Sequence, residues 1–171
     1  MNTDKSKLEE LQESTQTIFG QNLEKLILQH CQTRTKCAED TRYSRSELSK
    51  LLYGQRNLTL QKALRFARHF NISLFLLFSR NFEIFEYRNK FPFVDKDYTS
   101  VIRQNFKDLN GKQSKVDLDP STCSKLINGH RSNPTIKTLC RLALGANTSP
   151  AELLKTDEDK RIEKNLKEAT E

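Results

Sequence analysis

The sequence has no apolar run of the roughly 18 residues that a membrane-spanning helix requires. The longest candidate, Ile72 to Phe78, is far too short, and the polar residues 1–15 contain no apolar segment of the kind found in secretory signals. These absences predict a soluble cytoplasmic protein with no membrane partner.

The patterns typical of metal centres and catalytic sites are missing as well. The four cysteines have no C-x-x-C spacing, and although His30, Cys31 and Cys37 lie close in sequence, a zinc site is not favoured. Cys37, Cys123 and Cys140 fall where the helical pattern requires a buried apolar residue, a place that suits a free cysteine. The sequence also has no convergent Ser/His/Asp set and no glycine-rich phosphate loop. We therefore expect no cofactor, no metal and no enzymatic activity.

Positive charge is in excess and unevenly distributed. The 171 residues include 29 Lys and Arg against 22 Asp and Glu, which gives a formal net charge of +7. Residues 19–154 hold 22 basic and 12 acidic side chains, whereas residues 1–18 and 155–171 together hold 7 basic and 10 acidic ones. A basic central region with acidic ends predicts a polyanionic partner that contacts the central region.

One segment occurs twice. SELSKLLYGQRN at residues 46–57 recurs as STCSKLINGHRS at residues 121–132, so the frame S-x-x-S-K-L-[LI]-x-G-x-R repeats 75 residues later, from Gly54 to Gly129. Each copy predicts a short amphipathic helix that carries hydroxyls and a lysine on one face and ends at glycine. The repeat indicates two small units of about 60 residues each.

Capping signals around the first copy predict a series of short helices. Thr33 can cap a helix over residues 35–41, and Ser44 to Glu47 form a capping box that starts the next helix. Thr59 is expected to cap a fourth helix, and a short fifth helix follows Ser73. The fold class is therefore predicted to be all-α.

The second copy has the same order of capping residues and helices, but the capping residues differ. Asp119 caps a helix whose first turn holds Pro120, Thr135 caps the next, and Ser149 to Glu152 form another capping box. Upstream the copies differ, because the stretch between Phe106 and Leu118 has little room for a normal second helix. Residues 111–116 are a weak, glycine-led candidate for it.

We expect five segments. They are an N-terminal helical arm (residues 1–18), a first helix-turn-helix unit (19–78), an aromatic-rich connector (79–97), a second unit (98–155) and a charged C-terminal tail (156–171). Gly20 is expected to divide the helical stretch of residues 4–30. The arm either frays in solvent or docks on its own domain or on another subunit. The tail, with Ile162, Leu166 and Ala169 on one face, is either a solvated helix or an oligomer contact.

The connector has one proline and no glycine, which is not the composition of a flexible linker. Its apolar residues half fit a strand but fit a helix broken near Phe91 and Pro92 better. We expect them to pack the two units together, the alternative being stacking platforms for single-stranded nucleic acid. The residues concerned are Phe82, Ile84, Phe85, Tyr87, Phe91 and Phe93.

Both copies resemble the helix-turn-helix domains of the lambda-repressor and Cro family, also called XRE-like. The family pattern is met in the first copy by Thr33, Ala38, Tyr43, Ser44, Ser46, Leu48, Ser49, Lys50, Leu51, Gly54 and Arg56. The second copy matches from Leu118 onward. Arg34 stands where the family usually has a glutamine, which strengthens phosphate contact but loses the two-sided hydrogen bonding of an amide.

A major groove of B-DNA admits one α-helix, whose outward residues near its N-terminus meet the base edges. We therefore predict base readout by the outward residues of the repeated helix, with Arg45, Glu47 and Lys50 as the main readers. The full predicted set is Arg45, Ser46, Glu47, Ser49 and Lys50 in the first copy and Ser121, Thr122, Ser124 and Lys125 in the second.

Phosphate contacts are expected at the start of the second helix and in the loop after the repeated helix, since helix N-termini and basic loops suit phosphate. The predicted set is Arg34, Thr35, Lys36, Gln55, Arg56 and Asn57 in the first copy and His130, Arg131, Ser132 and Asn133 in the second. Tethering two such modules strengthens weak individual binding.

These observations predict a sequence-specific double-stranded DNA-binding transcription regulator. A bacterial, plasmid or phage repressor is favoured, because no separate ligand-sensing domain is visible in the sequence. Operator or promoter DNA, a second copy of the chain and a protein anti-repressor are its expected partners, and it would lie in the cytoplasm at the nucleoid. The alternative is an interaction or antitoxin-like module in which only one repeat binds DNA.

Overall fold

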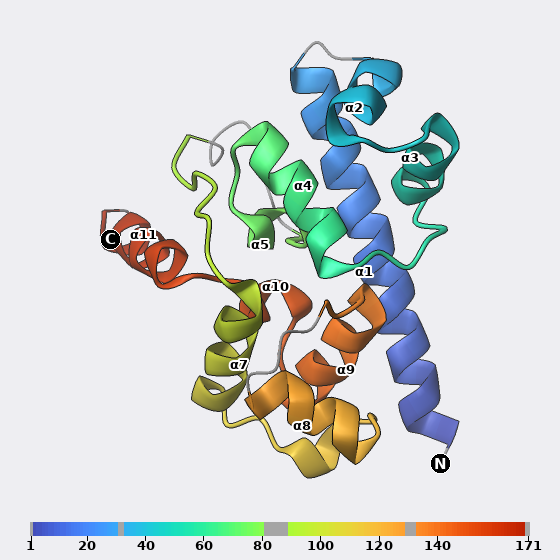
Figure 1. The fold of residues 1–171 in the computed structure, drawn as a ribbon. Coiled ribbons are helices and arrows are strands. Elements are labelled where there is room, and N and C mark those ends of the chain that lie inside the picture. Colours follow the sequence, from blue (N-terminus) through green and yellow to red (C-terminus); the bar gives the residue numbers. More distant parts are fainter. Residues whose placement is uncertain (1, 31–32, 81–88, 129–132, 170–171) are drawn as a thin grey trace.

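The structure is a computed structural model that describes residues 2–30, 33–80, 89–128 and 133–169. Every regular element in these ranges is helical, which confirms the all-α prediction (Figure 1). The helices are α1 (Asn2–Gln29), α2 (Arg34–Thr41), α3 (Arg45–Leu52), α4 (Leu60–Phe70), α5 (Leu74–Leu77), α7 (Tyr98–Asp108), α8 (Pro120–Asn128), α9 (Ile136–Gly145), α10 (Pro150–Leu153) and α11 (Asp157–Glu168), with a 3₁₀ turn, η1 (Gln113–Lys115), before α8. In the described part of the chain, none of them is long and apolar enough to cross a membrane.

Most of the predicted caps form. Thr33 Oγ1 accepts from Lys36 N at 3.1 Å, and Ser44 and Glu47 make both bonds of the capping box. Asp119 Oδ1 accepts from Thr122 N at 2.8 Å and starts α8. These side chains satisfy N–H groups that a helix leaves without internal partners.

Two caps differ from the prediction. Thr59 occupies the N-cap position of α4 but makes no capping bond through its side chain. Ser149 Oγ accepts from Glu152 N at 3.3 Å, yet Glu152 turns its carboxylate to Lys155 Nζ, 2.5 Å away, so the predicted second capping box is only half formed. A lysine within reach competes successfully with a backbone N–H for the glutamate.

The expected break at Gly20 is wrong, because α1 runs without interruption from Asn2 to Gln29. Glycine is needed there for another reason. A Cβ at Gly20 would lie 2.4 Å from the carbonyl oxygen of Leu52 and 2.7 Å from that of Leu51. The missing side chain lets the end of α3 rest directly on α1.

The N-terminal arm docks on its own chain. The first half of α1 runs beside α9, which belongs to the other half of the chain (Figure 1). Leu8 and Thr15 are buried, and Cys140 Sγ of α9 lies 3.6 Å from Thr15 Oγ1. This contact buries apolar surface, so the arm helps to hold the two units together.

One asparagine in each unit performs the same task. Asn22 Nδ2 on α1 donates to the carbonyl oxygens of Leu76, Leu77 and Ser79, at 3.2, 3.2 and 3.0 Å. Asn105 Nδ2 on α7 donates to those of Glu152, Leu153 and Lys155, at 3.3, 3.0 and 2.8 Å. In both units a buried amide collects the free carbonyls at the end of a short helix, α5 or α10. The asparagines thus make α1 and α7 structural equivalents.

The second unit has no full second helix. Residues 113–115 form only the 3₁₀ turn η1 where the first unit has the eight residues of α2. The short stretch between Phe106 and Leu118 predicts this difference.

The described residues of the connector, 79–80 and 89–97, form no helix, in agreement with the expected break near Phe91 and Pro92, while residues 81–88, where the helix is expected, lie outside the described residues. Phe91 is nevertheless buried, with its ring centroid 5.3 Å from that of Phe75, and its carbonyl accepts from Ser73 N at 2.8 Å. Phe93 lies beneath the guanidinium of Arg68. Phe82, Ile84, Phe85 and Tyr87 lie outside the described residues.

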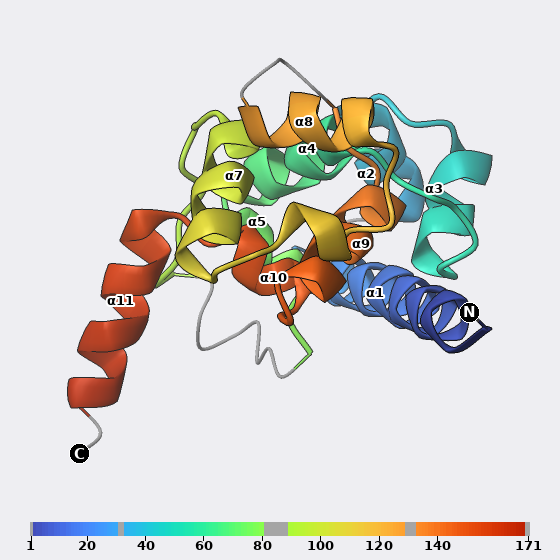
Figure 2. The same cartoon turned by 90° about the horizontal axis from the view of Figure 1, so that it is seen from below.

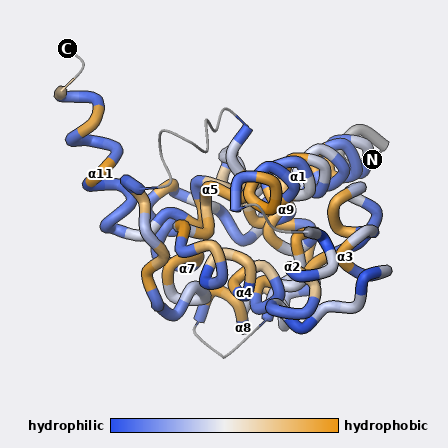
Figure 3. The backbone as a smooth tube through the Cα atoms, turned by 90° about the horizontal axis from the view of Figure 1, so that it is seen from above, coloured by the Kyte–Doolittle hydropathy of each residue, from blue (hydrophilic) through white to orange (hydrophobic). Residues whose placement is uncertain are grey.

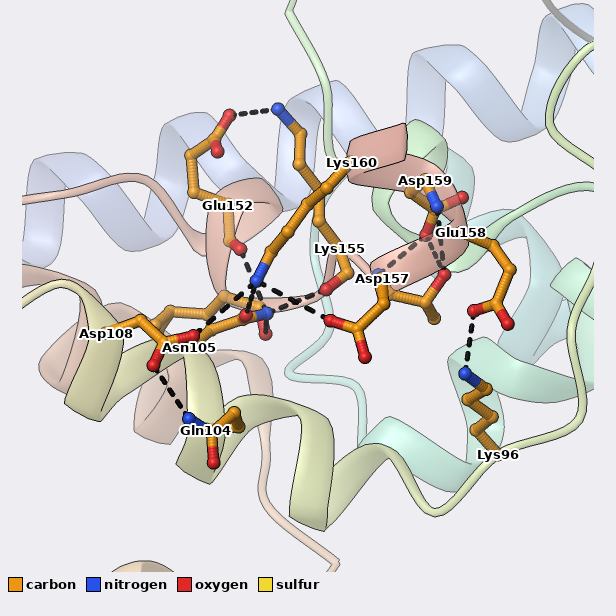
Figure 4. Close-up of polar contacts among 12 residues, drawn as sticks. Lys96, Gln104, Asn105, Asp108, Glu152, Lys155, Asp157, Glu158, Asp159 and Lys160 are labelled. Atoms are coloured by element: carbon orange, nitrogen blue, oxygen red, sulfur yellow. Dashed lines mark hydrogen bonds and ion pairs between the residues drawn. The ribbon is translucent and has the colours of Figure 1, made fainter. Parts of the chain in front are cut away.

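The tail forms α11, which extends away from the body and is mostly hydrophilic (Figures 2 and 3), with Ile162 and Leu166 packed against the core. Its first turn is anchored by a polar network that combines a local capping box of Thr156 and Asp159 with bonds to distant residues (Figure 4). The carboxylate of Asp159 is buried and accepts from Thr156 N and from Ser73 Oγ, both at 2.8 Å. Lys160 Nζ donates to Asn105 Oδ1 at 2.6 Å.

Candidate nucleic-acid interface

The two faces of α3 differ sharply. Leu48, Leu51 and Leu52 are buried, because they continue the apolar stripe that packs on α1 and α2. Arg45, Ser46 and Lys50 are exposed, and Glu47 and Ser49 are half-buried. Within the described residues, neither the guanidinium of Arg45 nor the ammonium of Lys50 has a hydrogen-bond or ion-pair partner. The predicted base-reading residues therefore lie together on one outer face.

α8 has the same division. Cys123, Leu126 and Ile127 are buried in its own unit. Ser121, Thr122 and Lys125 are exposed on the outer side, while Ser124 is half-buried and its hydroxyl accepts from Asn128 Nδ2 at 2.8 Å. In Figure 1, α3 and α8 both lie at the periphery of the molecule. The repeated sequence thus places two similar polar faces on the outside.

The carboxylate of Glu47 is already bonded to other residues of the chain. One carboxylate oxygen completes the capping box with Ser44, and the other lies 3.1 Å from Arg56 Nη1 and 3.8 Å from Lys62 Nζ. The bond from the Ser44 backbone is the main cause that lowers the pKa of Glu47. To accept from a cytosine, this carboxylate would have to release Arg56. The geometry favours a bracing role for Glu47, with Arg45 and Lys50 as the more available readers.

The start of α2 gathers cations whose charges are balanced within the chain. Arg34 pairs with Glu24 of α1 and lies over the ring of Tyr53, 5.8 Å from its centroid. The hydrogen bond to Glu24 is the main cause that raises the pKa of Arg34. Lys36 Nζ lies 2.9 Å from Asp40. Exposed pairs of this kind hold only weakly, so a phosphate can replace the carboxylates.

In the loop after α3, Gln55 and Asn57 are exposed and Arg56 is half-buried. Asn57 Oδ1 accepts from Lys137 N at 3.3 Å, and Asn133 Oδ1 accepts from Gln61 N at 2.9 Å. The side-chain oxygens of both asparagines therefore connect the two units, and the amide nitrogen of Asn133 also donates to Gln61 Oε1 at 3.4 Å. His130, Arg131 and Ser132, the other predicted contacts of the second loop, lie outside the described residues.

Gln61 and Lys137 take part in this junction although the repeated motif ends before them. A sequence signal for it exists, because N-L-T at residues 57–59 recurs as N-P-T at residues 133–135, 76 residues later, so the second unit has one more residue than the first between the repeated motif and this tripeptide. Thr59 and Thr135 form the isolated antiparallel bridge that joins the units. The asparagines of this second, shorter repeat are part of the junction as well as of the candidate surface.

The cysteines lie away from this surface. Cys37, Cys123 and Cys140 are buried free thiols, and burial raises the pKa of Cys37 and of Cys140 to about 11. In the described ranges, no three His, Cys, Asp or Glu side chains come close enough together to hold a metal ion. These thiols serve as small apolar core residues.

Comparison with known proteins assigns neither a family nor a function to the chain. No family model, no curated protein and no solved structure matches the chain. The argument for function therefore depends on the repeated helix, its exposed polar face and the charge around it.

Proposed function

We propose that the protein is a sequence-specific double-stranded DNA-binding transcription regulator, and that α3 and α8 are recognition helices of two helix-turn-helix units. The observation that carries the proposal is the position of Lys50 and Lys125. Both lie on the exposed polar face of a helix whose opposite face is buried, at the same place in a repeated motif. A helix with this division of faces can enter a major groove without disturbing its own core.

The surroundings of α3 support the same function. Arg34 and Lys36 at the start of α2 and Arg56 in the loop after α3 provide cations on either side of the recognition helix. Phosphate contacts from such positions fix the register, and the residues of α3 then read base edges. Acting as a repressor, the protein would occupy promoter DNA and exclude polymerase.

A second candidate function is an interaction module in which only the first unit binds DNA. The observation that favours it is the 3₁₀ turn η1, which replaces α2 in the second unit and removes one source of phosphate contacts. In that case α8 would contact a protein partner, as in an antitoxin or anti-repressor. The two candidates differ in whether α8 contributes to DNA affinity.

The test begins with selection of bound fragments from a random duplex pool, followed by footprinting. Lys50→Ala should weaken binding to the selected duplex by about 1–3 kcal/mol and relax the preference at one base pair. Arg56→Ala should weaken selected and scrambled duplexes alike and reduce the salt slope by about one. Fluorescence anisotropy at several salt concentrations measures both effects.

Lys164→Ala is the matched control, because Lys164 is exposed on α11 and, among the residues that the structure describes, pairs only with Glu168, 3.7 Å away. It should leave both affinities unchanged. Equal losses for Lys50→Ala and Arg56→Ala on every duplex would contradict the assigned roles. A pool that yields no enriched sequence would contradict the function itself.

A further inference from the structure

The segments that follow α3 and α8 pair with each other reciprocally. Leu60 N donates to the carbonyl oxygen of Pro134 at 2.8 Å, and Ile136 N donates to that of Leu58, also at 2.8 Å. Thr59 and Thr135 stand at the N-cap positions of α4 and α9, so Leu58 and Leu60 on either side of the first correspond to Pro134 and Ile136 on either side of the second. Each backbone bond from one unit therefore has its counterpart from the other.

The side chains repeat this reciprocity. Asn57 of the first unit accepts from the backbone N–H of Lys137, and Asn133 of the second accepts from that of Gln61, which is the equivalent position. Each asparagine thus binds the first turn of the other unit's helix, α9 or α4. The side chain of Asn133 also reaches Gln61 Oε1, at 3.4 Å.

Reciprocal, antiparallel contact between equivalent residues is the property of a two-fold axis. If residue i contacts residue j, its equivalent contacts the equivalent of j in return, as in the interface of a symmetric dimer. Units related by translation alone would join different surfaces and leave one of the two contacts unmade. The junction at Thr59 and Thr135 therefore behaves locally as the dyad of a dimer within one chain.

The recognition helices are linked to this axis by segments of nearly the same length. Thr59 follows Gly54 of the repeated motif by five positions, and Thr135 follows Gly129 by six. The axis thus relates the surroundings of α3 to those of α8. Two-fold axes perpendicular to a DNA duplex relate half-sites of opposite direction, and a two-fold protein matches them.

We infer that a single chain is an intramolecular pseudo-dimer that reads one inverted-repeat duplex, with α3 on one half-site and α8 on the other. This inference rests on the proposed function and specifies its substrate. One chain then does what a symmetric repressor needs two copies to do.

The inverted repeat should be unequal, because the two readers differ. Arg45 at the start of α3 corresponds to Pro120 in α8, and Glu47 corresponds to Thr122. Proline has no side-chain donor or acceptor for a base, and threonine can serve several bases. The half-site under α3 is therefore the more stringent one, and only a chain with two different units can fix the direction of such a site.

The experiment uses the full chain and duplexes built from the selected half-sites in inverted, direct and single arrangement. Inverted duplexes should bind at least tenfold more tightly than the other two, with one 19.9 kDa chain per duplex in analytical ultracentrifugation. Inserting about 5 bp between the inverted half-sites turns them to opposite faces of the duplex and should cost at least tenfold in affinity.

Two variants test the residues. Lys125→Glu should weaken inverted duplexes at least tenfold while leaving single α3 half-sites unchanged. Asn57→Ala combined with Asn133→Ala should loosen the junction and reduce the penalty of the insertion severalfold. Asn165→Ala, an exposed asparagine on α11, is the matched control and should change neither value. Circular dichroism of each variant reports whether it is folded.

Several outcomes would overturn the inference while leaving the proposed function intact. They are a preference for direct repeats, full affinity for a single half-site, two chains on one inverted repeat, and unchanged affinity of folded Lys125→Glu. A complete absence of duplex preference would overturn the proposed function as well. The pattern of results therefore separates the two failures.

Discussion

The two units are held together internally by equivalent hydrogen bonds but differ beside α3 and α8. Asn22 and Asn105 bind the carbonyls of equivalent short helices, and the loops at Thr59 and Thr135 mirror each other. In contrast, the full helix α2 of the first unit is a single 3₁₀ turn in the second. Bonds that hold a unit together are retained on both sides, whereas the element that would add phosphate contacts is reduced in one.

A second difference lies in how α3 and α8 rest on their supporting helices. Gly20 of α1 allows the carbonyls at the end of α3 to come very close. The asparagine equivalence places Arg103 of α7, which has a long side chain, at the matching position. The close approach that Gly20 permits is thus a feature of the first unit for which α7 has no glycine.

Among the substitutions that test this comparison, Gly20→Val should cause the largest loss of stability. Its first side-chain atom would lie within 2.4 Å of a backbone oxygen, which cannot move away without shifting α3. We expect a loss of about 3 kcal/mol in the free energy of unfolding. Urea denaturation followed by circular dichroism measures it.

Arg103→Val is the control in the second unit. Arg103 already carries a Cβ, so valine introduces no new first side-chain atom there and should cost under about 1 kcal/mol, mainly through its lower helix propensity. Similar losses at the two positions would mean that the units support their recognition helices in the same way.

Replacing the two asparagines should have effects of intermediate and similar size. Asn22→Ala leaves three carbonyls without their shared donor, and we expect a loss of about 1–3 kcal/mol. Asn105→Ala should fall at the upper end of that range, because Asn105 also accepts from Lys160 of α11. Urea denaturation compares the two.

Asn22→Asp and Asn105→Asp sharpen the test, since a carboxylate has the same shape but cannot donate to the carbonyls. Neither should restore stability. If one alanine variant proved neutral while the other cost the expected amount, the structural equivalence of α1 and α7 would be wrong.

Much of the helical pattern can be predicted from sequence because its causes are local. Thr33, Ser44 and Asp119 cap helices through bonds that span three residues, and the apolar spacing of Leu48, Leu51 and Leu52 identifies the buried face of α3. The outward direction of Lys50 follows from the same spacing. The candidate surface is therefore largely visible in the sequence.

The remaining features depend on contacts between distant residues. Gly20 resembles a helix break until the carbonyls of Leu51 and Leu52 are placed against it. Glu47 satisfies a base-reading pattern, yet its ion pair with Arg56 is set by the path of the loop. Local periodicity also cannot reveal that the asparagines of the N-x-T repeat join the two units, since that pairing connects residues 57–61 with residues 133–137.

The N-terminal caps of α5 and α10 also differ between the units, and this difference should have the smallest effect on stability. Ser149 caps its own helix α10, whereas the equivalent Ser73 makes no capping bond and donates instead to the buried Asp159 of α11. Burial raises the pKa of Asp159, despite the bonds that its carboxylate accepts. The folded protein therefore holds this proton more tightly than the unfolded chain does.

Linkage gives the direction of the pH dependence. Stabilisation by the protonated carboxyl is complete below the unfolded pKa, near 4, and is lost as the pH rises through the raised folded value. The free energy of unfolding of the wild type minus that of Asp159→Asn should thus fall as the pH rises through this window and stay level above it. Urea denaturation across a pH series measures this difference. If the difference does not change with pH, the hydrogen bonds from Ser73 and Thr156 fully offset the burial of the charge, and the raised pKa of Asp159 is wrong.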